Sequence, residues 1–68
     1  MIEELCEYLI RQGYGEDEAN DVHFAYLKGD IEEAVKVAES WNDNEHDYRN
    51  EVRIDIMNWR EEVGEDVH

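Results

Sequence analysis

Residues 46–63 read HDYRNEVRIDIMNWREEV, and this stretch decides the fold. Its apolar side chains recur at intervals of four, four, three and four residues, which places them on one face of an α-helix: Tyr48, Val52, Ile56, Trp59 and Val63. A polar run at 42–44 precedes the pattern, and Gly64 follows it as a common helix stop. The sequence therefore predicts a long helix over about 46–63.

Three shorter helical patterns precede this helix. Apolar spacing predicts helices over about 2–12, 17–28 and 31–41. The periodicity breaks where glycines occur, at Gly13, Gly15 and Gly29. Asp30 followed by Glu33 has the pattern of a capping box at the start of the third helix.

These patterns predict an all-α protein with a single domain. Residues 1–41 are expected to form a compact three-helix bundle. Residues 42–68 are expected to add a longer fourth helix and a short tail to the same domain. With 68 residues, the chain is close to the smallest size that folds on its own core.

The net charge of the chain indicates which kind of partner it can bind. The chain has 20 Asp and Glu residues against 6 Lys and Arg, a formal charge of -14. This charge exceeds the magnitude of about 2 to 8 that usually keeps a small domain soluble. It repels nucleic acid and anionic membranes, so we expect a basic protein as partner and no direct binding to nucleic acid or membrane. Two Trp, four Tyr and one Phe supply core material and argue against disorder.

No residue pattern predicts catalysis, a cofactor or a metal site. Cys6 lies on the apolar stripe of the first helix with no histidine near it in sequence, so we expect a buried structural thiol. An acidic segment at 43–47 contains metal-ligand types, but it lacks the glycine and glutamate that a calcium loop requires at its sixth and twelfth positions. One cysteine and an acidic N-terminus predict a cytoplasmic protein. A chain of this size has little room for a substrate pocket, so we expect that it is not an enzyme.

The first forty residues carry a recognisable order of features. Leu9 stands four residues before Gly13, within the loop sequence Gln12-Gly13-Tyr14, and Ala19 stands six residues after that glycine. The segment GDIEEAV at 29–35 then opens the third helix. Over residues 5–38 this order resembles a ubiquitin-associated (UBA) domain. The resemblance implies a compact three-helix bundle.

The same resemblance implies a protein-binding loop at Gly13 and Tyr14. Gln12 stands where the family usually has Met, and His23 where it usually has Leu. Tyr14 and Trp41 are then the large apolar side chains that could supply the binding surface of this loop. The implied function is that of an adaptor that binds a folded partner.

Charges on the C-terminal helix are sorted about its apolar stripe. Acidic residues lie one position before the apolar set, at Asp47, Glu51, Asp55 and Glu62, and basic residues one position after it, at Arg49, Arg53 and Arg60. Two arrangements remain open. The helix could fold back on the bundle, or it could pair with a second copy along a seam of Val52 and Ile56, with Arg53 and Arg60 beside it and Asp55 of one chain meeting Arg60 of the other.

Two further apolar residues of this helix point away from the seam. Ile54 and Met57 would stay exposed if only one face packed on the bundle. We therefore expect an interface on this helix, whichever arrangement it adopts.

Two functions fit these observations. In size and charge the chain resembles small acidic proteins of phages and mobile elements, which block host or defence proteins. This resemblance implies a non-enzymatic inhibitor, in which carboxylates one helical turn apart, about 6 Å along the axis, imitate phosphates in a basic nucleic-acid-binding surface. The expected binding residues are Asp47, Tyr48, Glu51, Asp55, Trp59, Glu61 and Glu62. The alternative is the UBA-like adaptor that binds through the Gly13-Tyr14 loop.

Overall fold

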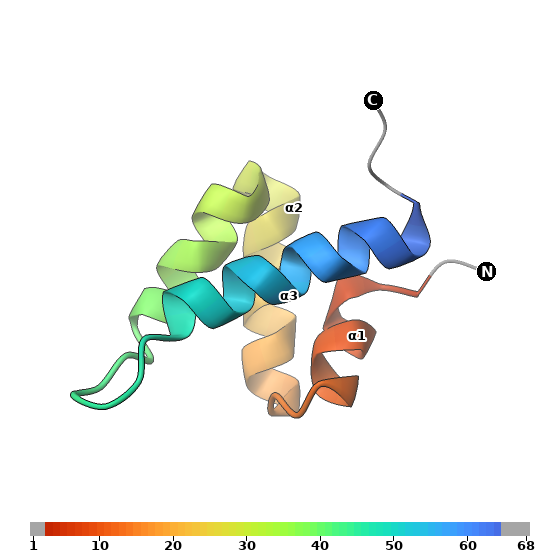
Figure 1. Ribbon diagram of the computed structural model, residues 1–68. Helices are drawn as coiled ribbons and strands as arrows, with labels where there is room; N and C mark the ends of the chain where they lie inside the picture. The colour runs from red at the N-terminus through yellow and green to blue at the C-terminus, as the bar shows by residue number, and fades with distance from the viewer. Residues whose placement is uncertain (1–2, 65–68) are drawn as a thin grey trace.

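The computed structural model describes residues 3–64, and all secondary structure in that range is helical (Figure 1). Helix α1 spans Leu5–Arg11, α2 spans Glu16–Glu39 and α3 spans Tyr48–Val63. The all-α class predicted from the sequence is confirmed. The count of four helices is wrong, because the described chain has three.

Helix α2 takes the place of the two central helices expected at 17–28 and 31–41. Its backbone leaves the helical conformation only at Gly29, with φ -146° and ψ 23°, and Asp30, with φ 66° and ψ -156°. At this break the chain reverses direction, so that α2 has two limbs (Figure 1). Only these two residues separate the limbs, so α2 counts as one element and the C-terminal helix is the third rather than a fourth.

The sequence Gly29-Asp30 suits this break for two reasons. A Cβ atom on residue 29 would collide with the side chain of Glu33, so glycine lets the second limb approach closely. Asp30 has a positive φ that is rare for a residue with a side chain. Its carboxylate Oδ1 accepts a hydrogen bond from the backbone N–H of Ile31 at 2.7 Å.

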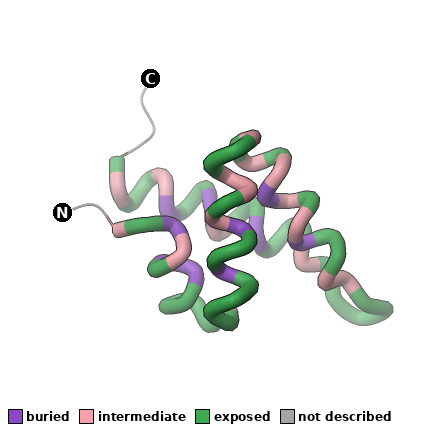
Figure 2. The backbone as a smooth tube through the Cα atoms, turned by 180° about the vertical axis from the view of Figure 1, so that it is seen from behind, coloured by how far each residue is buried: buried purple, intermediate pink, exposed green. Residues whose placement is uncertain are grey.

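All three helices contribute to one core. Buried residues recur at intervals along each helix, and most of the other described residues are exposed (Figure 2). Helix α2 contributes mainly alanines, which keep its two limbs close to the other helices. The core consists of Leu5, Tyr8, Leu9, Ala19, Val22, Ala34, Ala38, Val52, Ile56 and Trp59.

Helix α3 closes this core by lying across the other two helices (Figure 1). Val52 and Ile56 are 0% exposed and Trp59 is 5% exposed. The indole Nε1 of Trp59 donates a hydrogen bond to the backbone carbonyl of Glu3 at 2.8 Å, and its ring meets Tyr26 edge to face. Of the two arrangements left open by the sequence, the structure has the one in which the helix folds back.

Local contacts define both ends of α3, and the C-terminal stop at Gly64 is the one expected from the sequence. The Asp47 side chain accepts a hydrogen bond from the backbone N–H of Arg49, which caps the first turn. Gly64 ends the helix in the left-handed conformation, with φ 72°. No helix within residues 3–64 has both the length and the apolar character needed to cross a bilayer.

Candidate protein-binding groove

A surface groove of about 630 Å³ lies where the α1–α2 loop meets the start of α3. We call it the aromatic groove. Its walls come from three parts of the chain: the α1–α2 loop with the first turn of α2, the segment between α2 and α3, and the first turn of α3. The lining residues are Gln12, Gly13, Tyr14, Gly15, Glu18, Trp41, His46, Tyr48 and Glu51.

The α1–α2 loop is shaped by backbone hydrogen bonds that turn it back on α1. Gly13 N–H donates to the carbonyl of Ile10 at 3.0 Å, and Tyr14 N–H donates to the carbonyl of Leu9 at 3.1 Å. This turn requires a φ of 111° at Gly13, which residues with a Cβ rarely adopt. The loop thereby directs the Tyr14 side chain toward α3.

Aromatic rings form a continuous row in the groove. The Tyr14 and Trp41 ring centroids are 6.3 Å apart, and those of Trp41 and Tyr48 are 6.0 Å apart. The row continues to His46, whose ring centroid lies 4.2 Å from that of Tyr48. Tyr14, Trp41 and Tyr48 are partly buried against the core, so one side of each ring is supported by the fold. Such supported rings offer rigid contact area at a small entropic cost.

A hydrogen bond fixes Tyr14 to α3. Its hydroxyl donates to Oδ2 of Asp55 at 2.6 Å, across 41 positions of sequence. Burial raises the pKa of Tyr14, and the bond to the Asp55 carboxylate raises it further. The hydroxyl is therefore held as a neutral donor, and the loop cannot leave α3 without breaking this bond.

The opposite wall of the groove is fixed by polar contacts of the segment before α3. Nε2 of His46 lies 2.6 Å from Oε1 of Glu51, and the backbone N–H of Tyr48 donates to Oδ1 of Asn42 at 2.6 Å. Glu18 on the other side folds its carboxylate over Gly15, at the place where a Cβ would otherwise stand. Glu18 and Glu51 are both exposed, and none of the nine lining residues is Lys or Arg.

The structure brings together two regions that the sequence predicted, separately, to bind partners. Gly13, Tyr14 and Trp41 were expected to form a second binding loop, whereas Tyr48 and Glu51 were expected on the C-terminal helix. All five residues line the same groove. Asp55, also expected at the binding surface, reaches the groove through its hydrogen bond to Tyr14.

The sequence did not single out Glu18 or His46 as groove residues. Glu18 is one acid among twenty, and His46 lies in an irregular segment whose path no periodicity predicts. Only the spacing of five residues between His46 and Glu51 links them in sequence, and that is not a helical spacing.

Asp47 lies beside the groove and has a structural role. Its carboxylate accepts hydrogen bonds from Nε and Nη2 of Arg49, at 3.1 Å each, besides the backbone bond that caps α3. These bonds lower the pKa of Asp47 to about 2, with the Arg49 side chain as the largest cause. Its charge is therefore partly compensated within the chain.

The other predicted residues of α3 lie away from the groove. Trp59 is a core residue, so the expectation that it contacts a partner is wrong. Val52 and Ile56 are covered by the chain itself, so the seam proposed for a second copy is not accessible in this fold. The basic residues beside it have contacts within the chain: Arg53 donates to Asn50 at 3.0 Å, and Arg60 lies 3.8 Å from Asp30.

At the end of α3, Glu61 is exposed and Glu62 forms an ion pair with Arg11 at 3.1 Å. Ile54 and Met57 are 55% and 54% exposed, as their position off the main apolar stripe predicts. They lie outside the groove lining.

No protein-family model matches this chain, and neither a curated protein nor a solved structure matches it. The groove must therefore be interpreted from its own geometry.

Proposed function

We propose that this protein is a non-enzymatic inhibitor that binds a basic protein and occupies a surface that would otherwise hold nucleic acid. One observation carries the proposal: the aromatic groove combines a row of rings with carboxylates, and no Lys or Arg lines it. A groove of this composition suits the cationic side chains that such a partner presents.

The contacts that a cationic side chain would make in the groove follow from its walls. A guanidinium or ammonium group placed over the face of Tyr48 or Trp41 gains a cation–π attraction of about 0.5 to 2 kcal/mol, depending on how far water is excluded. Glu18 and Glu51, one on each side, can accept its hydrogen bonds. Arginine fits best, because its planar group can stack on a ring and bond a carboxylate at the same time.

Long-range electrostatics would bring the partner to this groove. A chain of 68 residues with a formal charge of -14 attracts a basic surface over the Debye length, about 10 Å at 0.1 M salt. The same charge repels phosphates, so nucleic acid and this protein would compete for one basic surface. Competition of this kind defines a nucleic-acid mimic and fits an anti-defence or host-takeover role in a phage.

The proposal is tested by capture and competition. The protein is immobilised, exposed to a bacterial lysate at low salt and eluted in salt steps, and each captured protein is then bound again in the presence of duplex DNA. We expect a basic protein that elutes as salt rises and that duplex DNA displaces. Capture that resists both high salt and DNA would contradict the proposal.

A UBA-like adaptor is the second candidate. It is supported by the order of α1, the two limbs of α2 and the break between them, which correspond to the three helices that this resemblance implies. It is also supported by the Gly13-Tyr14 loop, which lines the groove. An adaptor of this kind would bind a folded partner with little dependence on salt, and Tyr14→Ala would abolish that binding, whereas neutralising Glu18 and Glu51 would not.

A further inference from the structure

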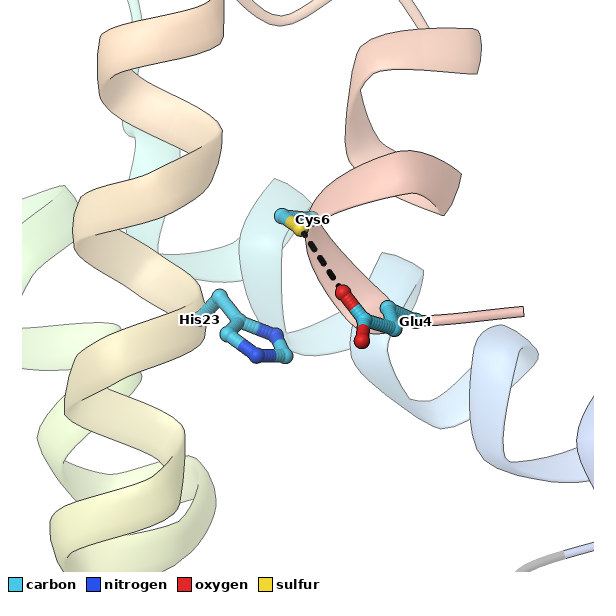
Figure 3. A group of neighbouring side chains, drawn as sticks. All are labelled: Glu4, Cys6 and His23. Carbon is cyan, nitrogen blue, oxygen red and sulfur yellow. Dashed lines mark hydrogen bonds between the residues drawn. The ribbon is translucent and has the colours of Figure 1, made fainter. Parts of the chain in front are cut away.

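A second group of side chains lies near the other end of α1, away from the aromatic groove. Glu4 directly precedes α1, Cys6 is in its first turn and His23 is in the first limb of α2. One potential ligand atom from each of the three lies within 4.8 Å of the other two (Figure 3). The Cys6 thiol donates a weak hydrogen bond to Oε1 of Glu4 at 3.8 Å. The sequence suggested no histidine partner for Cys6, because the two residues meet only through the packing of α1 on α2.

The histidine of this cluster has an unsatisfied atom. Nδ1 of His23 is buried and has no hydrogen-bond partner within the described residues. Buried polar nitrogens almost always have a partner, since leaving one without a hydrogen bond costs free energy. Figure 3 shows the imidazole facing Cys6 and Glu4, so a cation held between the three side chains could satisfy this nitrogen.

The donor atoms identify the class of cation. Thiolate sulfur, imidazole nitrogen and carboxylate oxygen are the three ligand types of protein zinc sites, with bonds of about 2.0 to 2.3 Å. Ligand atoms of a tetrahedral site with such bonds lie about 3.3 to 3.8 Å apart. The three ligand atoms lie within 4.8 Å of one another, so their separations would need to shrink by at most about 1 to 1.5 Å for zinc to bind all three.

We propose that Glu4, Cys6 and His23 form a zinc-binding site with three protein ligands and a water molecule in the fourth position. The thiol gives up its proton to solvent as the zinc–sulfur bond forms. In the absence of metal, burial and then the charge of Glu4 raise the pKa of Cys6, so this proton is otherwise firmly held. A divalent cation favours the thiolate instead, because its charge outweighs the effect of burial and compensates the carboxylate.

A metal ion at this place would join two elements of the core. Its ligands come from the start of α1 and from α2, so bound zinc would hold these helices together. The carbonyl of Glu3, one residue before the proposed ligand Glu4, already accepts the Trp59 hydrogen bond from α3. Zinc would therefore stabilise the folded chain by mass action, independently of any partner in the aromatic groove.

The site is tested with Co²⁺ and Zn²⁺ on the purified, reduced chain. Bound Co²⁺ should give a near-ultraviolet thiolate-to-cobalt charge-transfer band that saturates at one ion per chain and disappears when Zn²⁺ is added. Cys6→Ser should remove the band, and His23→Gln should weaken binding at least about 100-fold, since even outer-shell changes cost 10 to 100-fold. Glu32→Gln is the control, because it removes an exposed carboxylate outside the cluster and should leave both readouts unchanged.

Circular dichroism of each variant shows whether it is folded before metal is added. If Cys6→Ser fails to fold, His23→Gln and protection of the Cys6 thiol from alkylation by Zn²⁺ provide the test. Binding through surface carboxylates alone would produce no charge-transfer band and would contradict the proposal. A complex of two chains per ion would contradict it as well.

Discussion

The two ends of α3 differ in how far their apolar side chains are covered by the rest of the fold. In the middle and C-terminal part of the helix, Val52, Ile56 and Trp59 are covered by α1 and α2. At its start, Tyr48 joins Tyr14 and Trp41 in a row of rings that stays partly exposed and is flanked by carboxylates. The described core contains no buried charged side chain.

The difference shows that one apolar stripe serves two purposes. Over most of its length the stripe supplies the burial that a small chain needs in order to fold. At the first turn of α3 the stripe packs against loops instead of helices. The aromatic rings there stay partly exposed and lie beside acidic side chains. Stability should therefore depend on one end of the helix and partner binding on the other.

The largest expected effect separates the two tryptophans. Trp59→Ala should cost about 3 to 5 kcal/mol and leave much of the chain unfolded, because it removes a buried ring and its hydrogen bond to Glu3. Trp41→Ala should cost only about 1 to 2 kcal/mol, since that ring is partly exposed and loses two ring contacts. Urea unfolding followed by circular dichroism measures both. Equal losses would show that core and groove are not separate.

The next effect concerns the bond that fixes the loop to α3. Tyr14→Phe should cost about 1.5 kcal/mol, the lower end of the range for a hydrogen bond to a charged group, because Tyr14 is only partly buried. Tyr48→Phe, in the same row of rings, is the control and should be close to neutral. A double-mutant cycle with Asp55→Asn measures the coupling, and a coupling energy near zero would rule out this bond as a structural tie.

The raised pKa of Tyr14 adds a test at alkaline pH. In the unfolded chain tyrosine ionises near its ordinary value of 10.0, whereas the folded chain retains the proton. The folded state then binds more protons, so stability should fall as the pH rises above 10.0. Tyr14→Phe should make this decline shallower.

An effect of similar size is expected from the glycines of the α1–α2 loop. Gly13→Ala should cost about 1 to 3 kcal/mol, because a side chain is strained at a φ of 111°. Gly15→Ala, two residues later, has an ordinary φ of -68° and needs only a rearrangement of Glu18, so its cost should stay below about 1 kcal/mol. Thermal melts compare the two, and the reverse order would contradict the loop geometry.

The smallest effect concerns the cap of α3. The folded-state pKa of Asp47 is lowered to about 2, so its contribution to stability is present above the ordinary value of 3.8 and is lost as the pH falls from 3.8 to about 2. Asp47→Ala should lower the melting temperature at neutral pH and flatten the acid arm of the stability curve in this window. If the loss of stability between pH 3.8 and about 2 were the same in the variant, other carboxylates would be responsible for it and the prediction would be contradicted.

Local spacing in the sequence predicted the helices better than it predicted their contacts. The intervals among Tyr48, Val52, Ile56 and Trp59 identified the inward face of α3, and Gly64 identified its end. The spacing could not say what covers that face, so Trp59 was assigned to a partner although α1 and α2 bury it. The turn at Gly29 and Asp30 was located correctly, but spacing could not show that the Glu33 side chain occupies the place of a Cβ on residue 29.

The aromatic groove and the proposed zinc-binding site could not be predicted from the sequence, because each joins residues that are distant in sequence. Tyr14 and Asp55 are 41 positions apart, and His23 reaches Cys6 only after α1 packs on α2. The sequence showed which residue types were present, but it did not show that these side chains lie close together in the fold. The all-α fold class was therefore predictable from the sequence. For the sites, only individual residues and short segments were.

One comparison tests the central claim, that a basic partner binds in the aromatic groove. Glu18→Gln with Glu51→Gln removes two charges from the groove, and Asp21→Asn with Glu32→Gln removes two exposed charges outside it. The Kd of each variant for the captured basic protein is measured at one salt concentration. We expect the groove pair to lose at least about tenfold more affinity than the control pair, a difference of about 1.4 kcal/mol. Equal losses would show that only total charge matters and would contradict a binding site in the groove.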